Sequence, residues 1–169
     1  MDSVRFEEEQ KFHWLAFAVV YVVLLCALVA AGIAFLQAGE TEKLRDAWWI
    51  PLLIALGLVV CLNVFHMRTT VTEDQVIVQF GRFFPMYRKR IPLANINSSR
   101  AVEYRPIRDA GGWGIRFGRF ENKSCRFLNS RGSRGVLVET ADLRYIIGSQ
   151  VPEQLQRAIE TVGSSSDVS

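Results

Sequence analysis

The chain has 169 residues, of which half are hydrophobic and 22% are charged, and its formal net charge is +3. This length suits one small domain with additional segments, rather than several domains. Cys26 and Cys61 lie inside apolar runs and Cys125 stands alone, so a disulfide framework of the kind found in small secreted domains is not expected.

Two uncharged apolar runs, Trp14 to Leu36 and Trp48 to Phe65, occupy the first part of the chain. As helices they would reach about 34 Å and about 27 Å, close to the roughly 30 Å of a bilayer's hydrocarbon core. The runs therefore predict a transmembrane hairpin over residues 14–67, with spans at about 14–36 and 48–65 and a polar linker between them. Asn63 is expected near the headgroups, where it finds water. The acidic lead-in, Glu7 to Glu9, argues against a cleaved signal peptide.

Basic residues in short flanks set the orientation of membrane helices, because they resist translocation. Arg68 and Arg82 follow the second run, and Lys43 and Arg45 are the only basic residues of the linker. The bias predicts a multi-pass protein of the cell (plasma) membrane with both termini in the cytoplasm, including the segment 1–13. Three tryptophans at the run boundaries fit an interfacial aromatic belt, namely Trp14, Trp48 and Trp49.

From about residue 68 the composition is that of a water-exposed domain. Residues 75–80 alternate in the period of a strand, and several short β-rich segments follow, separated by glycine, proline and asparagine. After Pro152 the period changes to that of a helix with one apolar stripe. Residues 164–169 are expected to be a disordered tail. The stripe consists of Leu155, Ala158, Ile159 and Val162, and the strands are expected at 69–72, 75–80, 86–91, 98–104, 114–118, 124–128, 135–140 and 144–148.

Several segments of this region resemble a known group, above all Tyr104 to Arg116, which reads YRPIRDAGGWGIR. The chain resembles small prokaryotic membrane proteins with two spans followed by one bacterial pleckstrin-homology-like (PH-like) domain. The resemblance implies an α+β fold: an N-terminal transmembrane helical hairpin, then an antiparallel PH-like β-barrel or sandwich over residues 68–163, capped by a C-terminal helix. No reaction is assigned to that group, and a fold does not carry a function with it.

A glycine-rich loop lies inside this segment, with Gly111, Gly112 and Gly114 around Trp113. One interpretation is structural: the indole plugs a long hairpin loop, and Trp113→Ala then costs about 3 to 5 kcal/mol if the ring is buried. The other is a binding loop, whose exposed amides form an anion nest for phosphate or a carboxylate. Arginines flank the loop and would assist binding, namely Arg105, Arg108 and Arg116.

A second basic cluster is expected in the first hairpin of the domain, around the tip Phe83 to Pro85. In a strand, Arg88 and Arg90 share one face and Lys89 takes the other. By analogy with headgroup-binding PH domains, this hairpin is a candidate lipid or phosphate site; a solvated edge strand is the alternative. The exposed aromatics of the tip would reach the bilayer interface. The cluster comprises Arg82, Arg88, Lys89 and Arg90.

Catalysis, a metal site and nucleic-acid binding are not expected. The two histidines, His13 and His66, fall at the membrane boundaries, and two ligands are too few for a structural zinc site. From residue 66 onward the chain carries sixteen Lys or Arg and ten Asp or Glu, a mixture without the usual nucleic-acid footprint. The separated carboxyl groups that could act as acid and base are expected to be surface charges, namely Glu103, Asp109 and Glu139.

The sequence thus predicts a membrane-anchored module without enzymatic activity or cofactors. Its expected role is to scaffold a protein partner or its own self-association beside the lipid bilayer. The alternative role is a sensor of anionic lipid headgroups or phosphate that uses the basic first hairpin.

Overall fold

The computed structural model describes residues 3–12, 14–37, 49–64 and 66–163. His13 and Trp48 lie outside the described residues, as do most of the expected linker and the expected tail. The side chains of Trp14 and Trp49 are also outside the description, so the expected aromatic belt remains a prediction.

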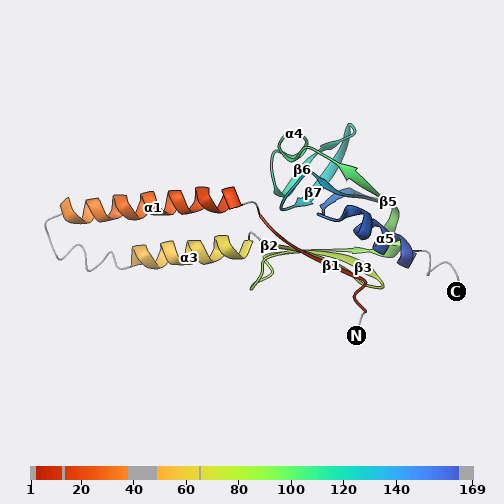
Figure 1. The fold of residues 1–169 in the computed structure, drawn as a ribbon, viewed down its shortest axis with the longest axis horizontal. Coiled ribbons are helices and arrows are strands. Elements are labelled where there is room, and N and C mark those ends of the chain that lie inside the picture. Colours follow the sequence, from red (N-terminus) through yellow and green to blue (C-terminus); the bar gives the residue numbers. More distant parts are fainter. Residues whose placement is uncertain (1–2, 13, 38–48, 65, 164–169) are drawn as a thin grey trace.

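Two apolar helices lie side by side and extend away from the β-rich part of the molecule (Figure 1). They are α1 (Trp14–Gln37) and α3 (Trp49–Val64), and both follow the apolar runs to within a residue or two. Large apolar side chains such as Val22, Leu25 and Leu53 are more than half exposed on them. Among the described residues, no helix is found that is both long and apolar enough to cross a membrane.

The first sheet has four antiparallel strands in the order β1-β2-β3-β4. In β3, Val76, Val78 and Phe80 are buried while the residues between them are half-buried, which confirms the period-two pattern. The strands are β1 (Phe6–Lys11), β2 (His66–Val71), β3 (Gln75–Phe80) and β4 (Tyr87–Pro92).

Strand β1 was not expected, because residues 1–13 read as a charged lead-in to the first helix. It pairs with β2 along its whole length, from Phe6 opposite Val71 to Lys11 opposite His66. Glu8 and Gln10 point toward the second sheet. The Glu8 carboxylate accepts hydrogen bonds from the Ser149 hydroxyl (2.6 Å) and from the Gln150 backbone N–H (2.7 Å). The segment before α1 is therefore a part of the β domain.

The second sheet has five strands in the order β5-β8-β9-β7-β6, and it is mixed rather than purely antiparallel. Strand β9 inserts between β8 and β7 and runs parallel to β7, with Phe127 opposite Ile146. A central position suits β9 because Tyr145, Ile146 and Ile147 are all buried. The strands are β5 (Ile96–Glu103), β6 (Gly114–Phe120), β7 (Lys123–Asn129), β8 (Arg134–Thr140) and β9 (Arg144–Gly148).

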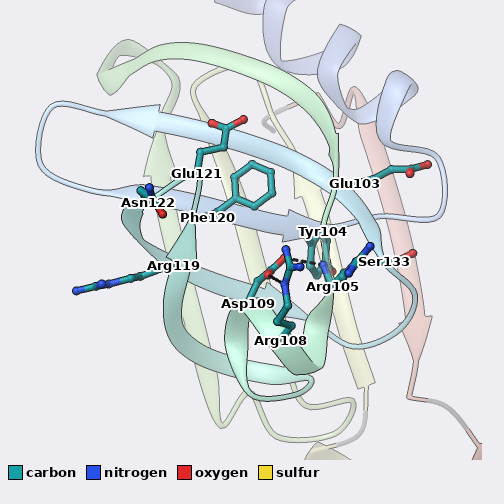
Figure 2. A pocket seen from close by; sticks show the side chains of 10 residues that line it. All are labelled: Glu103, Tyr104, Arg105, Arg108, Asp109, Arg119, Phe120, Glu121, Asn122 and Ser133. Carbon is teal, nitrogen blue, oxygen red and sulfur yellow. Dashed lines mark hydrogen bonds and ion pairs between the residues drawn. The ribbon is translucent and has the colours of Figure 1, made fainter.

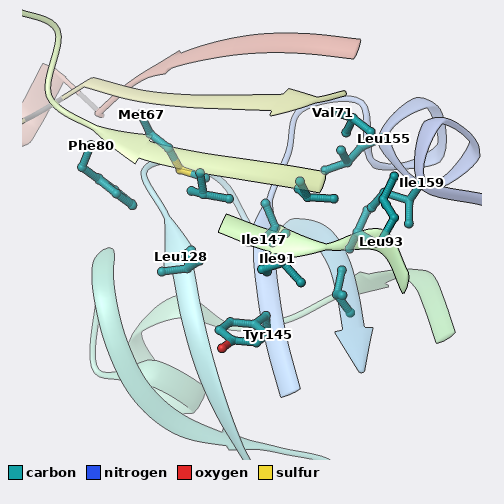
Figure 3. Close-up of a cluster of buried hydrophobic side chains, with 14 residues drawn as sticks. Met67, Val71, Phe80, Ile91, Leu93, Leu128, Tyr145, Ile147, Leu155 and Ile159 are labelled. Atoms are coloured by element: carbon teal, nitrogen blue, oxygen red, sulfur yellow. The ribbon is translucent and has the colours of Figure 1, made fainter. Parts of the chain in front are cut away.

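Apolar clusters lie on both faces of the second sheet. The larger one fills the space between the sheets and is closed by α5 (Pro152–Gly163) through Leu155 and Ile159 (Figure 3). The smaller one lies on the other face, around Phe127 and Ile146, and includes Ala110 of the short helix α4 (Pro106–Ala110). A 3-10 turn, η1 (Leu93–Asn95), links the two sheets. The expected α+β architecture is thus present: two sheets with the C-terminal helix on them.

Candidate functional site

The basic first hairpin adopts the expected alternation. Arg88 and Arg90 are exposed on the outer face of β4, opposite Gln79 and Ile77 of β3. Lys89 points the other way, with its Nζ 5.4 Å from the centre of the Tyr145 ring. The structure therefore separates Lys89 from the two arginines with which the sequence grouped it.

Arg88 and Arg90 form no ion pair with any other described residue. On the same outer face, Arg68 of β2 pairs with Glu7 and Glu9 of β1. The first sheet therefore carries its acidic groups at the β1 edge and its unneutralised cations at the β4 edge. Charges of this kind remain available to a partner of opposite charge.

The tip of this hairpin is fastened to the end of α3 by Asn63. The Asn63 Oδ1 accepts hydrogen bonds from the backbone N–H groups of Phe83 (2.7 Å) and Phe84 (3.1 Å), and its Nδ2 donates to the Phe84 carbonyl oxygen (2.8 Å). Asn63 is only 3% exposed. The expectation that this amide finds water was wrong, because the hairpin tip satisfies it.

Gly81 makes that attachment possible. Its φ of +112° belongs to the region that favours glycine, and a Cβ there would lie 2.1 Å from the Phe84 carbonyl oxygen. Its backbone N–H donates to the His66 carbonyl oxygen at 2.9 Å. The tip is thus held against both the last turn of α3 and the first residue of β2.

The second predicted cluster is only partly assembled. Arg105 and Arg108 line an open cavity of about 620 Å³ beside α4, whereas Arg116 is not part of its lining (Figure 2). The Arg116 Nε lies instead 3.4 Å from the Trp113 carbonyl oxygen. Arg119 of β6, which sequence reasoning did not select, joins the lining. The full lining is Glu103, Tyr104, Arg105, Arg108, Asp109, Arg119, Phe120, Glu121, Asn122 and Ser133.

Acidic groups balance the arginines of this cavity. The Asp109 carboxylate accepts hydrogen bonds from the Arg105 backbone N–H (2.8 Å) and from the Arg108 Nε (3.0 Å). These contacts, the backbone N–H first, hold the pKa of Asp109 below its usual value. Glu121 bonds to Arg100 and has its pKa lowered in the same way. The negative charges of the ionised Asp109 and Glu121 carboxylates therefore disfavour the binding of an anion in this cavity.

The glycine-rich loop is not an anion nest, because its amides are already bonded within the chain. The backbone N–H groups of Gly111 and Gly112 donate to the carbonyl oxygens of Ile107 (3.0 Å) and Pro106 (2.8 Å). The Gly114 N–H donates to the Asn129 Oδ1 at 3.0 Å. The loop therefore has a structural role: it ends α4 and begins β6.

Trp113 is 38% exposed, and its Nε1 donates to the Gly132 carbonyl oxygen at 3.3 Å. The condition for a cost of 3 to 5 kcal/mol, a buried ring, is not met. We expect Trp113→Ala to lower the free energy of unfolding by about 1 to 2 kcal/mol, since only part of the apolar area is lost. Chemical denaturation measures this value. Phe127→Ala, at a fully buried ring, is the comparison and should cost about 3 to 5 kcal/mol; equal losses would contradict the half-exposed position of Trp113.

Tyr104 predicts a dependence of stability on high pH. Burial raises the pKa of Tyr104 to about 12, although its hydroxyl accepts a hydrogen bond from the Asn129 Nδ2 at 3.1 Å. The unfolded chain ionises near pH 10, so the free energy of unfolding should fall between pH 10 and 12, by roughly 2 to 3 kcal/mol in total. Denaturation at pH 9 and at pH 11.5 measures the loss. Tyr104→Phe should remove this part of the slope, and an unchanged slope in that variant would contradict the assignment.

The described residues offer no group of three or more histidine, cysteine, aspartate or glutamate side chains that could hold a metal ion. Of the three separated carboxyl groups, Glu103 and Asp109 line the same cavity, whereas Glu139 bonds to Arg144 Nε at 2.7 Å. The pKa of Glu139 is lowered, chiefly by the hydrogen bond from Ser98. A lowered pKa is the opposite of what a general acid requires.

Sequence reasoning missed two features around the β3–β4 hairpin. Asn63 fastens the hairpin tip, and Arg126 of β7 lies between the rings of Tyr87 (5.3 Å) and Phe117 (5.0 Å). The only sequence signal for the attachment by Asn63 is the presence of an amide near the end of an apolar run.

Comparisons of the chain with protein families, with curated proteins and with solved structures gave no match.

Proposed function

We propose that this chain is an integral membrane protein that holds a PH-like module at the cytoplasmic face of the plasma membrane. The module acts there as a non-enzymatic scaffold for a protein partner or for a second copy of itself. Two sheets closed by a C-terminal helix support the PH-like assignment, although the parallel β7–β9 pair departs from a simple antiparallel succession of strands.

The membrane anchor is supported by the full apolar runs of the sequence. In the sequence, the run from Trp14 to Leu36 contains no charged residue, and as a helix it would reach about 34 Å, close to the thickness of a bilayer's hydrocarbon core. Apolar side chains exposed along both helices, such as Leu28 and Leu56, need a nonaqueous neighbour.

One observation carries the proposal: the strands that adjoin the two helices pair with each other. Lys11, the last residue of β1, lies opposite His66, the first residue of β2. Two residues connect Lys11 to α1, and one residue connects α3 to His66. A domain attached at two adjacent points by such short connections keeps a fixed orientation relative to the helices. That arrangement suits a module which presents one surface to partners beside the membrane.

The outer face of β4 is the proposed contact surface. Its cations, Arg88 and Arg90, form no ion pair among the described residues, so they favour an acidic protein surface. The alternative occupant is an anionic lipid headgroup, which the position of this hairpin beside α3 favours.

Photo-cross-linking in native membranes distinguishes the two occupants. A photoreactive residue in place of Ile77, which faces Arg90 across the strands, should capture a protein or a second copy of the chain. Reversing the cations (Arg88→Glu with Arg90→Glu) should abolish the capture. The charge reversal Arg131→Glu, at an exposed arginine in the loop between β7 and β8, should leave the capture unchanged. Capture of lipid alone would favour the alternative, and recovery of the intact chain in the aqueous fraction without detergent would refute the anchor.

A further inference from the structure

An exposed apolar surface lies at the tip of the β3–β4 hairpin, which Asn63 of α3 contacts. It is formed by the hairpin tip, which we define as Arg82 to Met86, together with Phe117 of β6. Phe83, Phe84 and Phe117 are 69 to 70% exposed, and Met86 is 59% exposed. Large side chains grouped in this way are costly to leave in water and mark an interaction surface.

The tip has a fixed position relative to α3. Asn63, which belongs to the last turn of that helix, makes its three side-chain hydrogen bonds to Phe83 and Phe84. The Asn63 carbonyl oxygen also accepts a hydrogen bond from the Arg82 backbone N–H at 3.3 Å. Figure 1 shows the last turn of α3 beside the end of the first sheet that lies nearest to the two helices. The exposed rings therefore lie at the level of the last turn of α3.

Cations accompany the rings, and the hairpin itself carries no acidic residue; Glu9 of the neighbouring strand β1 lines a small pocket with Arg82. The Arg82 guanidinium lies 5.6 Å from the centre of the Phe83 ring. Arg126 lies between Tyr87 and Phe117, and its buried Nε has no hydrogen-bond partner among the described residues. The sequence contains no aspartate or glutamate from residue 75 to residue 102. Aromatic rings combined with arginine match the interface of a bilayer with anionic headgroups.

We propose that the hairpin tip inserts its aromatic side chains into the bilayer interface beside the end of α3, in the leaflet that faces the β domain. This inference rests on the proposed membrane anchor and extends it. The tip forms a third point of attachment, which fixes the tilt of the β domain against the lipid surface. The partner is the lipid surface itself, because the continuity with α3 places the rings at headgroup depth whenever α3 is in the membrane.

A fluorescent probe attached to cysteine tests the insertion in the full chain, reconstituted in vesicles of phosphatidylcholine and phosphatidylglycerol. The three native cysteines are replaced by alanine, and an environment-sensitive probe is attached to Phe84→Cys. The matched control is Leu143→Cys, an exposed apolar position in the turn after β8, which lines a groove with Pro92 at the opposite end of β4. We expect a blue-shifted emission and quenching by headgroup-labelled lipid at position 84, and neither effect at position 143.

Each of the following results would overturn the inference or one of its parts. Equal, water-like emission at both positions excludes insertion. Shielding at position 84 without lipid quenching indicates a protein on the surface and also refutes the proposal. Asn63→Ala should weaken the quenching at position 84, and an unchanged signal would refute the fastening role of Asn63. A chain that retains only Cys26, near the middle of α1, separates the two proposals when it is probed with lipid labelled on its acyl chains. Quenching at Cys26 with no headgroup quenching at position 84 refutes insertion alone, whereas quenching at neither position refutes the anchor itself.

Discussion

Residues 66–169 alone are expected not to fold, whereas the same residues joined to residues 3–12 by a short glycine-serine linker should fold. Without β1, the edge of β2 loses its partner along six residue pairs. The buried Gly148 carbonyl oxygen loses the hydrogen bond from Gln10 Nε2 (2.9 Å), and Ser130 loses its bond to Gln10 Oε1 (2.9 Å). Each buried polar group left unpaired costs about 1 to 3 kcal/mol, against a total stability of about 5 to 15 kcal/mol for a domain.

Circular dichroism and thermal unfolding of the two polypeptides measure this effect. A point variant isolates the interior contacts: Gln10→Ala should cost about 2 to 4 kcal/mol, since it leaves two buried partners unpaired. Glu9→Ala, on the exposed outer face of the same strand, should cost less than about 1 kcal/mol. A stable fold of residues 66–169 without β1 would contradict the account of this strand.

Gly118→Ala is expected to displace α4 and to lower the free energy of unfolding by about 3 kcal/mol. A Cβ at Gly118 would lie 2.0 Å from the Asp109 carbonyl oxygen and 2.9 Å from the Ala110 Cα, both of which are backbone atoms. Backbone cannot rotate away as a side-chain tip does, so α4 must move away from β6. The cavity lined by Arg105 and Arg108 then changes its shape.

Equilibrium denaturation gives the loss of stability, and amide hydrogen exchange over residues 106–120 reports the displacement. Gly32→Ala is the matched control, because a Cβ there meets no atom within 4 Å. It should leave the domain's stability unchanged. Equal effects of the two substitutions would contradict the close approach of α4 and β6.

Periodicity predicted most strands and the C-terminal helix, because these elements bury one face. In β3 the buried residues alternate, and in α5 Leu155 and Ile159 lie one turn apart. Strand β1 has no such pattern, since its inward side chains, Glu8 and Gln10, are polar and satisfied by residues about 140 positions away. The position of β9 between β7 and β8 was also not predictable, because the local pattern of a strand does not show which distant strand it pairs with.

The candidate sites were predicted less well than the fold. Arg88 and Arg90 lie on the exposed face that alternation assigns to them, since strand geometry alone decides this. The sequence leaves two interpretations of the glycine loop open, a structural loop and an anion nest, because it does not reveal that Asn129 and the α4 carbonyl oxygens accept the loop N–H groups. The attachment of the hairpin tip by Asn63 joins residues about 20 positions apart, through contacts that no local pattern signals.

Cysteine accessibility in intact bacterial spheroplasts tests the membrane anchor most directly. Single cysteines are placed at Ser3→Cys before the helices, at Leu143→Cys in the domain and at Thr41→Cys between the apolar runs, in a chain without its native cysteines. A membrane-impermeant maleimide should label only position 41 until the membrane is opened, after which positions 3 and 143 should react as well. Labelling of position 143 in intact spheroplasts, or protection of position 41, would contradict a two-helix anchor with the β domain in the cytoplasm.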